Sequence, residues 1–229
     1  MVQSTTTHVA NNLFQSLWHE LKFLEKPITM YEFGDRERTH GSLILNLHKA
    51  VWVHRKISPW LWIPFLRRNI DRMTSSQELY VTYTNFVLNN TVIYILNPFH
   101  RLVTACSLIT AIAELCVDLG YPEALSYSPK IFEVFFNTVL KDDFEEHGGW
   151  KGVEEYILKQ SYLKWYRCKE LLRSSQNVKE KLQQELNFAK YIETMARNST
   201  KVYFSPVDSK QNEVESDEKC RLLTSKVMN

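Results

Sequence analysis

The sequence contains few of the residues that most often mark turns. Glycine occurs only 6 times and proline 7 times among 229 residues, and this scarcity favours long helices over a turn-rich β architecture. The 4 cysteines lie far apart, so that they form neither a disulfide framework nor a CxxC metal pair. The net charge of +2 is too small to indicate a nucleic-acid-binding protein, and no basic run is interleaved with aromatic residues.

Motifs that mark an enzyme are absent as well. The chain has no glycine-rich phosphate loop, no nucleophile elbow and no HExxH helix. The acidic run at 142–146 is more typical of a solvated helix start than of a cation site. His48 and His54 fall on different faces of one predicted helix, so they cannot readily share a metal, and we expect each at the surface or in a groove. We therefore expect no catalytic residue, no metal site and no cofactor, and a binding module rather than an enzyme.

No stretch of the sequence has the pattern of a targeting or membrane-spanning segment. The first residues are polar and lack the apolar core of a signal peptide. The most continuous apolar run, at 102–115, has 14 residues, whereas a membrane span needs roughly 20. The tail beyond Ser205 is polar, so we expect no C-terminal membrane anchor. The predicted location is the cytoplasm.

The apolar run at 102–115 is the segment around which the rest of the chain is expected to fold. Only Thr104, Ser107 and Thr110 interrupt it before Glu114. A helix that is apolar on all sides is normally buried at the centre of a globule. A second apolar segment, at 130–140, is expected to pack antiparallel to it. Together they predict a buried helical hairpin of about 98–118 and 129–140.

Amphipathic segments flank this hairpin on both sides in the sequence. Apolar residues recur at spacings of three and four in 9–25 and 39–57, and a short aromatic helix is expected after Pro59. The piece at 91–96, TVIYIL, has strand propensity, but it is assigned to a helix ending near Leu96 because no partner strand is visible. The predicted fold is an all-α helical bundle with the following parts: a flexible N-terminus at 1–8, a helical domain at 9–160, further amphipathic helices at 161–197, and a polar, disordered tail at 198–229.

Two short motifs bracket the hairpin. The sequence PFHR at 98–101 precedes the apolar helix, GGW at 148–150 follows an acidic turn, and Trp150 comes 49 positions after Arg101. In these motifs and in the order of its helices, the chain resembles the Bcl-2 family of apoptosis regulators over roughly residues 9–160. The first homology motif of that family reads Asn-Trp-Gly-Arg, and the second contains Gly-Gly-Trp. Of the first motif, Arg101 alone is kept, and His100 adds bulk where the family has glycine.

The resemblance implies a hydrophobic groove that binds the amphipathic helix of a pro-apoptotic partner. The arginine of the first motif pairs there with an aspartate of the partner, a geometry that suits a guanidinium. Gly148, Gly149 and Trp150 correspond to the structural turn of the second motif. The expected groove residues are Arg101, Phe99, His100, Val51, Phe65, Tyr83 and Val87.

The third homology motif of the family, which ends in Gly-Asp, is degraded in this chain. Its preferred register is 47–52, where Val51 and Trp52 replace the glycine and the aspartate. A register at 66–71 keeps the aspartate as Asp71, but it leaves too little chain before Arg101 for two helices. The lost aspartate argues against a killer that donates its own helix to another family member, and it favours a pro-survival regulator.

Two other functions stay open. One is a pro-apoptotic member that permeabilises the mitochondrial membrane, and the other is a helical adaptor or effector that has lost groove binding. Peripheral association with mitochondria is a further expectation from the resemblance, and no nucleic-acid partner is expected. The amphipathic segment at 178–196 could fold back over the groove, pack elsewhere or pair with another chain.

Overall fold

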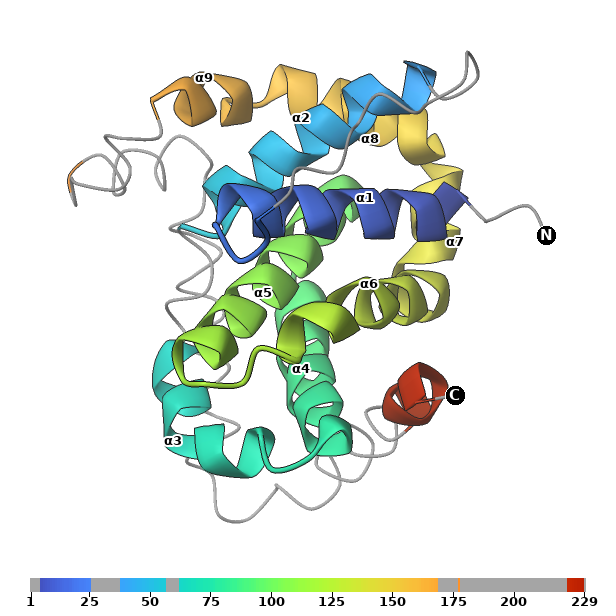
Figure 1. Ribbon diagram of the computed structural model, residues 1–229. Helices are drawn as coiled ribbons and strands as arrows, with labels where there is room; N and C mark the ends of the chain where they lie inside the picture. The colour runs from blue at the N-terminus through green and yellow to red at the C-terminus, as the bar shows by residue number, and fades with distance from the viewer. Residues whose placement is uncertain (1–4, 26–37, 57–61, 169–176, 178–221, 229) are drawn as a thin grey trace.

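The structure is a computed structural model, and it describes residues 5–25, 38–56, 62–168, 177 and 222–228. Within these residues the chain is helical and contains no strand (Figure 1). The all-α fold class is thereby confirmed. The elements are α1 (Thr5–Glu20), α2 (Arg38–His54), α3 (Ile63–Met73), α4 (Gln77–Val92), α5 (Pro98–Asp118), α6 (Ala124–Phe135), a π-helical turn (Phe136–Leu140), α7 (Lys141–Glu146), α8 (Gly149–Lys159) and α9 (Tyr162–Arg167).

Helix α5 lies at the centre of the bundle, where α2, α4 and α6 pack against it and α1 lies against α2 and α6 (Figure 1). Its polar interruptions are buried. The Thr110 hydroxyl donates to the Cys106 carbonyl at 2.7 Å and the Ser107 hydroxyl to the Thr104 carbonyl at 2.8 Å, whereas the Thr104 hydroxyl lies 3.4 Å from Nε2 of His54 on α2. Burial on all sides was expected from the apolar run. The helix has 21 residues, which is longer than that run.

The length of α5 changes one inference from the sequence. Among the described residues, α5 is the one helix that is long and apolar enough to span a membrane, a test that the buried core helix of a soluble protein also passes. The helix spans Pro98–Asp118, as predicted for the first arm of the hairpin, and is longer than the run of 14 apolar residues on which the comparison with a membrane span was based.

The second arm of the hairpin also begins earlier than expected. The second arm is predicted to begin at about residue 129, yet residues 124–129 are the first part of α6. The chain enters this helix through tight turns, in which Leu125 N donates to Pro122 O and Ser126 N to Glu123 O. Pro129 is the sixth residue of α6 and lies inside the helix, which continues past it to Phe135.

Both ends of the helical domain differ from the expected boundaries. Helix α1 begins at Thr5, Thr6 is buried, and the Thr7 hydroxyl donates to Glu133, so the prediction of a flexible N-terminus is wrong for residues 5–8. Helix α4 ends at Val92 and not near residue 96, and a turn leads into α5.

The C-terminal residues 222–228 form a short helical segment beside α4 (Figure 1). Leu223 and Val227 are buried, and the Thr224 hydroxyl lies 3.1 Å from that of Thr82. The prediction of a disordered tail is therefore wrong for these seven residues. The expected amphipathic helix at 178–196 lies outside the described residues.

The GGW turn links α7 to α8 and is built as a tight glycine turn. Gly148 and Gly149 have φ of +105° and +59°, left-handed values that favour glycine. Trp150 stacks on Phe136 with ring centroids 5.4 Å apart, and it meets the edge of Phe144 at 4.9 Å. The structural role expected for these three residues agrees with this packing.

Gly152 gives the first testable prediction, because the ring of Phe99 lies directly against its backbone. A Cβ atom at Gly152 would lie 2.5 Å from Phe99 Cζ and 2.9 Å from the His147 carbonyl oxygen. Gly152→Ala should therefore lower the free energy of unfolding by roughly 1–3 kcal/mol, as overpacking does. Urea denaturation measures this change.

Gly41 provides the matched control. It lies in the first turn of α2, and a Cβ atom there meets nothing within 4 Å. Gly41→Ala should raise the stability by about 0.5–1 kcal/mol, the usual gain for this change within a helix. Equal effects of the two substitutions would contradict the close approach of Phe99 to Gly152.

Candidate functional site

The turn between α4 and α5 fixes the position of Arg101. The side-chain oxygen of Asn97 caps α5 by accepting the backbone N–H of His100 at 2.9 Å. Pro98 is the first residue of the helix, where its missing N–H costs nothing. Arg101 then lies in the first turn, at the end of the helix dipole that disfavours a cation. A cation at this place requires compensation by acceptors.

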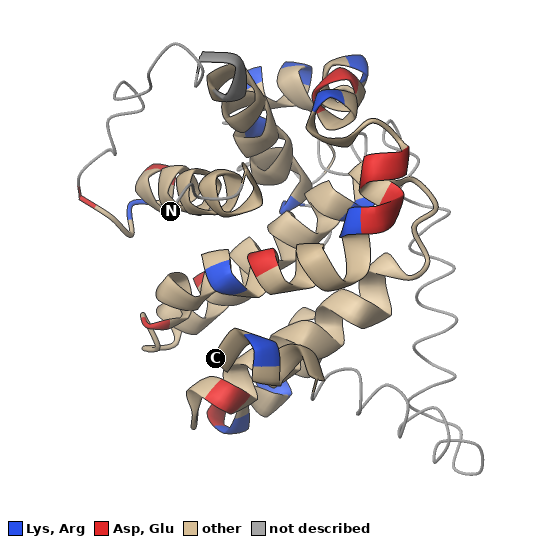
Figure 2. Ribbon diagram, turned by 90° about the vertical axis from the view of Figure 1, so that its right-hand side faces the viewer, with Lys and Arg blue, Asp and Glu red and all other residues tan. Residues whose placement is uncertain are grey.

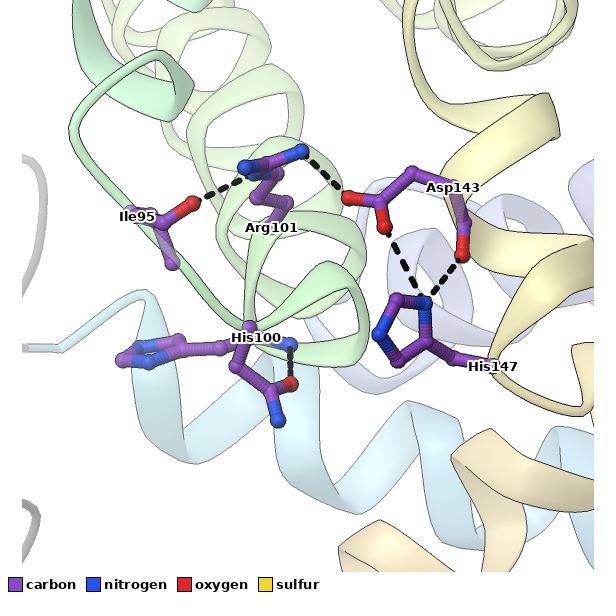
Figure 3. A network of polar contacts seen from close by, with 6 residues as sticks. Ile95, His100, Arg101, Asp143 and His147 are labelled. Atoms are coloured by element: carbon purple, nitrogen blue, oxygen red, sulfur yellow. Dashed lines mark hydrogen bonds and ion pairs between the residues drawn. The ribbon is translucent and has the colours of Figure 1, made fainter.

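Two acceptors hold the guanidinium of Arg101 (Figure 3). Its Nε donates to the backbone carbonyl of Ile95, and its Nη1 donates to Oδ2 of Asp143 at 2.6 Å. The side chains of Arg101 and Asp143 are 24% and 34% exposed, so the ion pair is partly buried and open to solvent on one side. Charge-assisted bonds of this kind are stronger than bonds between neutral groups. The negative charge of Asp143 thus offsets the unfavourable position of the Arg101 cation at the positive end of the α5 dipole.

The carboxylate of Asp143 also contacts His147, one turn further along the chain. His147 Nδ1 lies 3.0 Å from Oδ1 of Asp143 and 2.7 Å from its backbone carbonyl oxygen. Because both oxygens can only accept, the hydrogen lies on Nδ1 and is shared between them. A continuous network therefore runs from Ile95 through Arg101 and Asp143 to His147, next to Gly148. It joins the PFHR turn to the GGW turn.

The other acidic residues near Asp143 face the solvent. Asp142, Glu145 and Glu146 are exposed on α7, and Figure 2 shows the acidic residues of this helix as a red patch. This agrees with a solvated helix start. In the part of the chain that the structure describes, no group of three His, Cys, Asp or Glu residues is placed to hold a metal ion.

His100 belongs to a buried histidine pair. Its Nε2 lies 3.2 Å from Nε2 of His54, whose Nδ1 lies 2.8 Å from the hydroxyl of Ser107. Burial lowers the pKa of His54 well below its usual value and lowers the pKa of His100 to about 4. Both rings are therefore neutral at pH 7. The ring of His100 packs against that of His54 on α2, with centroids 5.4 Å apart.

His48 is also buried. Its two ring nitrogens contact the hydroxyl of Ser16 at 2.8 Å and Oε2 of Glu20 at 2.6 Å. The prediction that His48 and His54 lie at the surface or in a groove is therefore wrong. Polar partners on α1 and α5 satisfy their nitrogens inside the protein, and a helical pattern alone cannot reveal such partners.

Three of the expected groove residues belong to the core. Val51 and Val87 are fully buried, and Phe99 is nearly so. The ring of Phe99 packs against Phe144 and Tyr156, with centroids 5.7 Å and 5.9 Å apart. The prediction that these three side chains line an open groove is wrong for this structure. An apolar position on a helix face is equally compatible with a core and with a groove floor.

Phe65 and Tyr83 lie in a partly buried aromatic cluster between α3 and α4. Phe65 contacts Tyr83 at 6.0 Å and Phe86 at 5.7 Å between ring centroids. Trp62 joins the cluster, and its Nε1–H donates to the Thr91 hydroxyl at 2.9 Å. Helix α3 therefore covers one face of α4. The aromatic side chains that were candidates for a groove wall hold these two helices together.

Exposed apolar residues lie in the turn that binds Arg101, and the sequence pattern did not predict their exposure. Ile93 is 68% exposed and Leu96 is 91% exposed, on either side of the Ile95 carbonyl that binds Arg101. The signal is the TVIYIL piece, which is assigned from the sequence to a helix ending near Leu96. Since α4 ends at Val92, part of this piece turns toward the solvent.

The candidate site therefore consists of Arg101, Asp143 and His147 with the apolar residues Ile93 and Leu96 beside them. It comes from three separate parts of the sequence that meet at the start of the central helix. No family model matches the chain, and neither a curated protein nor a solved structure matches it.

The histidine pair gives a testable pH dependence. Burial lowers the pKa of His100 to about 4 in the folded protein, whereas in the unfolded chain this pKa has its usual value of 6.5. Protonation therefore favours unfolding, and the stability that depends on a neutral His100 is lost as the pH falls from about 6.5 to about 4. His100→Gln should reduce the slope of stability against pH in this range, as measured by urea denaturation.

The difference between the slopes of stability against pH of the wild type and of His100→Gln reports on His100. Carboxylates such as Asp143 lose their ion pairs in both proteins, so their contribution is the same in both slopes. Identical slopes for both proteins would show that the pKa of His100 is the same in the folded and the unfolded state, which would contradict its lowering by burial.

Proposed function

We propose that this protein is a pro-survival regulator of apoptosis that binds the amphipathic helix of pro-apoptotic partners at the start of its central helix. Binding uses apolar contacts together with an ion pair between Arg101 and a carboxylate of the partner. The protein acts in the cytoplasm and peripherally at mitochondria. It requires no cofactor, and nucleic acid is not a partner.

The support comes from the combination of two motifs and one fold. The PFHR turn begins a buried central helix, and the GGW turn closes the hairpin that contains it. The order of the helices around the hairpin is the one that the resemblance implies. The degraded third motif at 47–52 lies within α2 and holds no aspartate that could engage another member.

The observation that carries the proposal is the ion pair of Arg101. A guanidinium at this position binds a carboxylate in the folded protein, it is 24% exposed, and it also binds a carbonyl of the turn that carries the exposed residues Ile93 and Leu96. A fully solvated arginine would not need two acceptors from other parts of the chain, here the Ile95 carbonyl and Asp143. The guanidinium of Arg101 can therefore also bind a carboxylate of a partner's amphipathic helix.

The predicted effect of Arg101→Ala is a loss of affinity for a killer-derived helical peptide by roughly 1–3 kcal/mol, the range for a hydrogen bond to a charged group. Isothermal titration calorimetry with a panel of such peptides measures it. Arg72→Ala is the matched control, because Arg72 is exposed and lies before α4. The length of α4 separates it from Arg101 by roughly 24 Å. Equal affinities for the Arg101 variant and the wild type would remove Arg101 from the binding site.

A pro-apoptotic, membrane-permeabilising activity is the second candidate, and the length and apolar character of α5 favour it. In the folded protein this helix is surrounded by others, so insertion would require the bundle to open. A pro-survival regulator should not release dye from liposomes of mitochondrial lipid composition when it is added alone. Release by the protein alone would contradict the pro-survival assignment and support the second candidate.

An adaptor that has lost groove binding is the third candidate. The burial of Val51, Val87 and Phe99 favours it, because these side chains cannot meet a partner without a rearrangement. A pull-down with the same peptide panel separates this candidate from the first. Capture of no peptide would leave the adaptor as the better account.

A further inference from the structure

We propose that Asp143 is an internal competitor for the carboxylate of a partner, so that an acidic amphipathic helix binds by displacing Asp143 from Arg101. This inference rests on the proposed function and concerns the regulation of the same site. It assigns to α7 a role that neither motif implies. Arg101 and Asp143 are 42 residues apart in the sequence, and the fold brings them together.

The guanidinium of Arg101 is only partly used by Asp143. Nε is bound to the Ile95 carbonyl and Nη1 to a single oxygen of Asp143, while Nη2 makes no hydrogen bond with the described residues. The contact with Asp143 is therefore made through one of its oxygens. A partner carboxylate could engage Nη1 and Nη2 with both of its oxygens, and two-point arginine contacts are the stronger kind. An incoming carboxylate can thus replace Asp143 with a gain.

Asp143 can be released without leaving a buried charge unpaired. Its second oxygen already faces His147 Nδ1 at 3.0 Å, and its side chain is 34% exposed. After release, His147 and water would still satisfy the carboxylate. An unpaired buried charge would oppose the exchange strongly, whereas a solvated one costs little. The contact with His147 thus allows Asp143 to leave Arg101 and to return to it.

The neighbouring surface defines the chemistry of the partner. Ile93 and Leu96 are exposed beside the Ile95 carbonyl, and Arg101 follows within the first turn of α5. A helix that contacts this surface needs an apolar side chain about one turn away from an aspartate or glutamate, so that both lie on one face. The matching partner is therefore an amphipathic helix with an acidic residue at the border of its apolar face.

The test measures the affinity of a synthetic amphipathic helical peptide with one aspartate at that border. Calorimetry compares the wild-type protein with Asp143→Asn and with Asp142→Asn. Asp142 is exposed and precedes Asp143 in α7, so its variant makes the same change in net charge. We expect Asp143→Asn to bind the peptide about 3- to 10-fold more tightly, the gain for removing a partly exposed competing ion pair.

The control variant Asp142→Asn should bind like the wild type. The same peptide with asparagine in place of aspartate should not distinguish the three proteins. Equal affinity of Asp143→Asn and wild type for the aspartate peptide, together with weaker binding by Arg101→Ala, would overturn the competition and leave the proposed function intact. No binding to any of the proteins, or binding that ignores Arg101, would overturn the proposed function as well.

A measurement on the wild-type protein keeps the test valid if Asp143→Asn does not fold. The carboxyl carbon of Asp143 should shift in the NMR spectrum when the aspartate peptide is added, because its partner changes from arginine to water. The asparagine peptide should not cause this shift. An unchanged Asp143 resonance at saturation with the aspartate peptide would overturn the inference.

Discussion

The burial of α5 is the constraint on which the rest of the structure depends. A helix that is apolar on every side gains free energy only if other elements exclude water from all of its faces. Helices α2, α4 and α6 pack against it, and the hydroxyls of Thr110 and Ser107 bond to carbonyls of α5 itself. Buried polar groups that are satisfied within the helix cost little, so the apolar cover can be continuous.

The two ends of the hairpin need more specific contacts than apolar packing can give. At its start, Arg101 opposes the helix dipole and is held by Ile95 and Asp143. At its close, the spacing of one helical turn in α7 brings His147 next to Asp143 just before the GGW turn, and Phe99 rests on Gly152. Packing and the ion pair thus join the same two turns. If the proposed function holds, the ion pair between Arg101 and Asp143, which joins the two turns, is also the contact that a partner's carboxylate must replace.

The sequence predicted those features that local pattern determines. An apolar run on all faces indicates a core helix, and paired glycines before a tryptophan indicate a tight turn. The sequence did not predict the environment of Val51 and Val87, because a helix face that packs in the core and one that lines a groove have the same apolar pattern. It also did not predict the contacts of His54 with His100 or the partner of Arg101. These pairs are 46 and 42 residues apart, and only the packing of whole helices brings them together.

The central claim is that the ion pair between Arg101 and Asp143 joins the opening and closing turns of the hairpin. A double-mutant cycle tests it most directly, with Arg101→Gln, Asp143→Asn and the double variant compared with wild type by urea denaturation. The account predicts a coupling free energy of about 0.5–2 kcal/mol, as expected for a partly buried charged pair in contact. Additive effects of the two substitutions would contradict the account, because they would show that the two side chains contribute to stability independently.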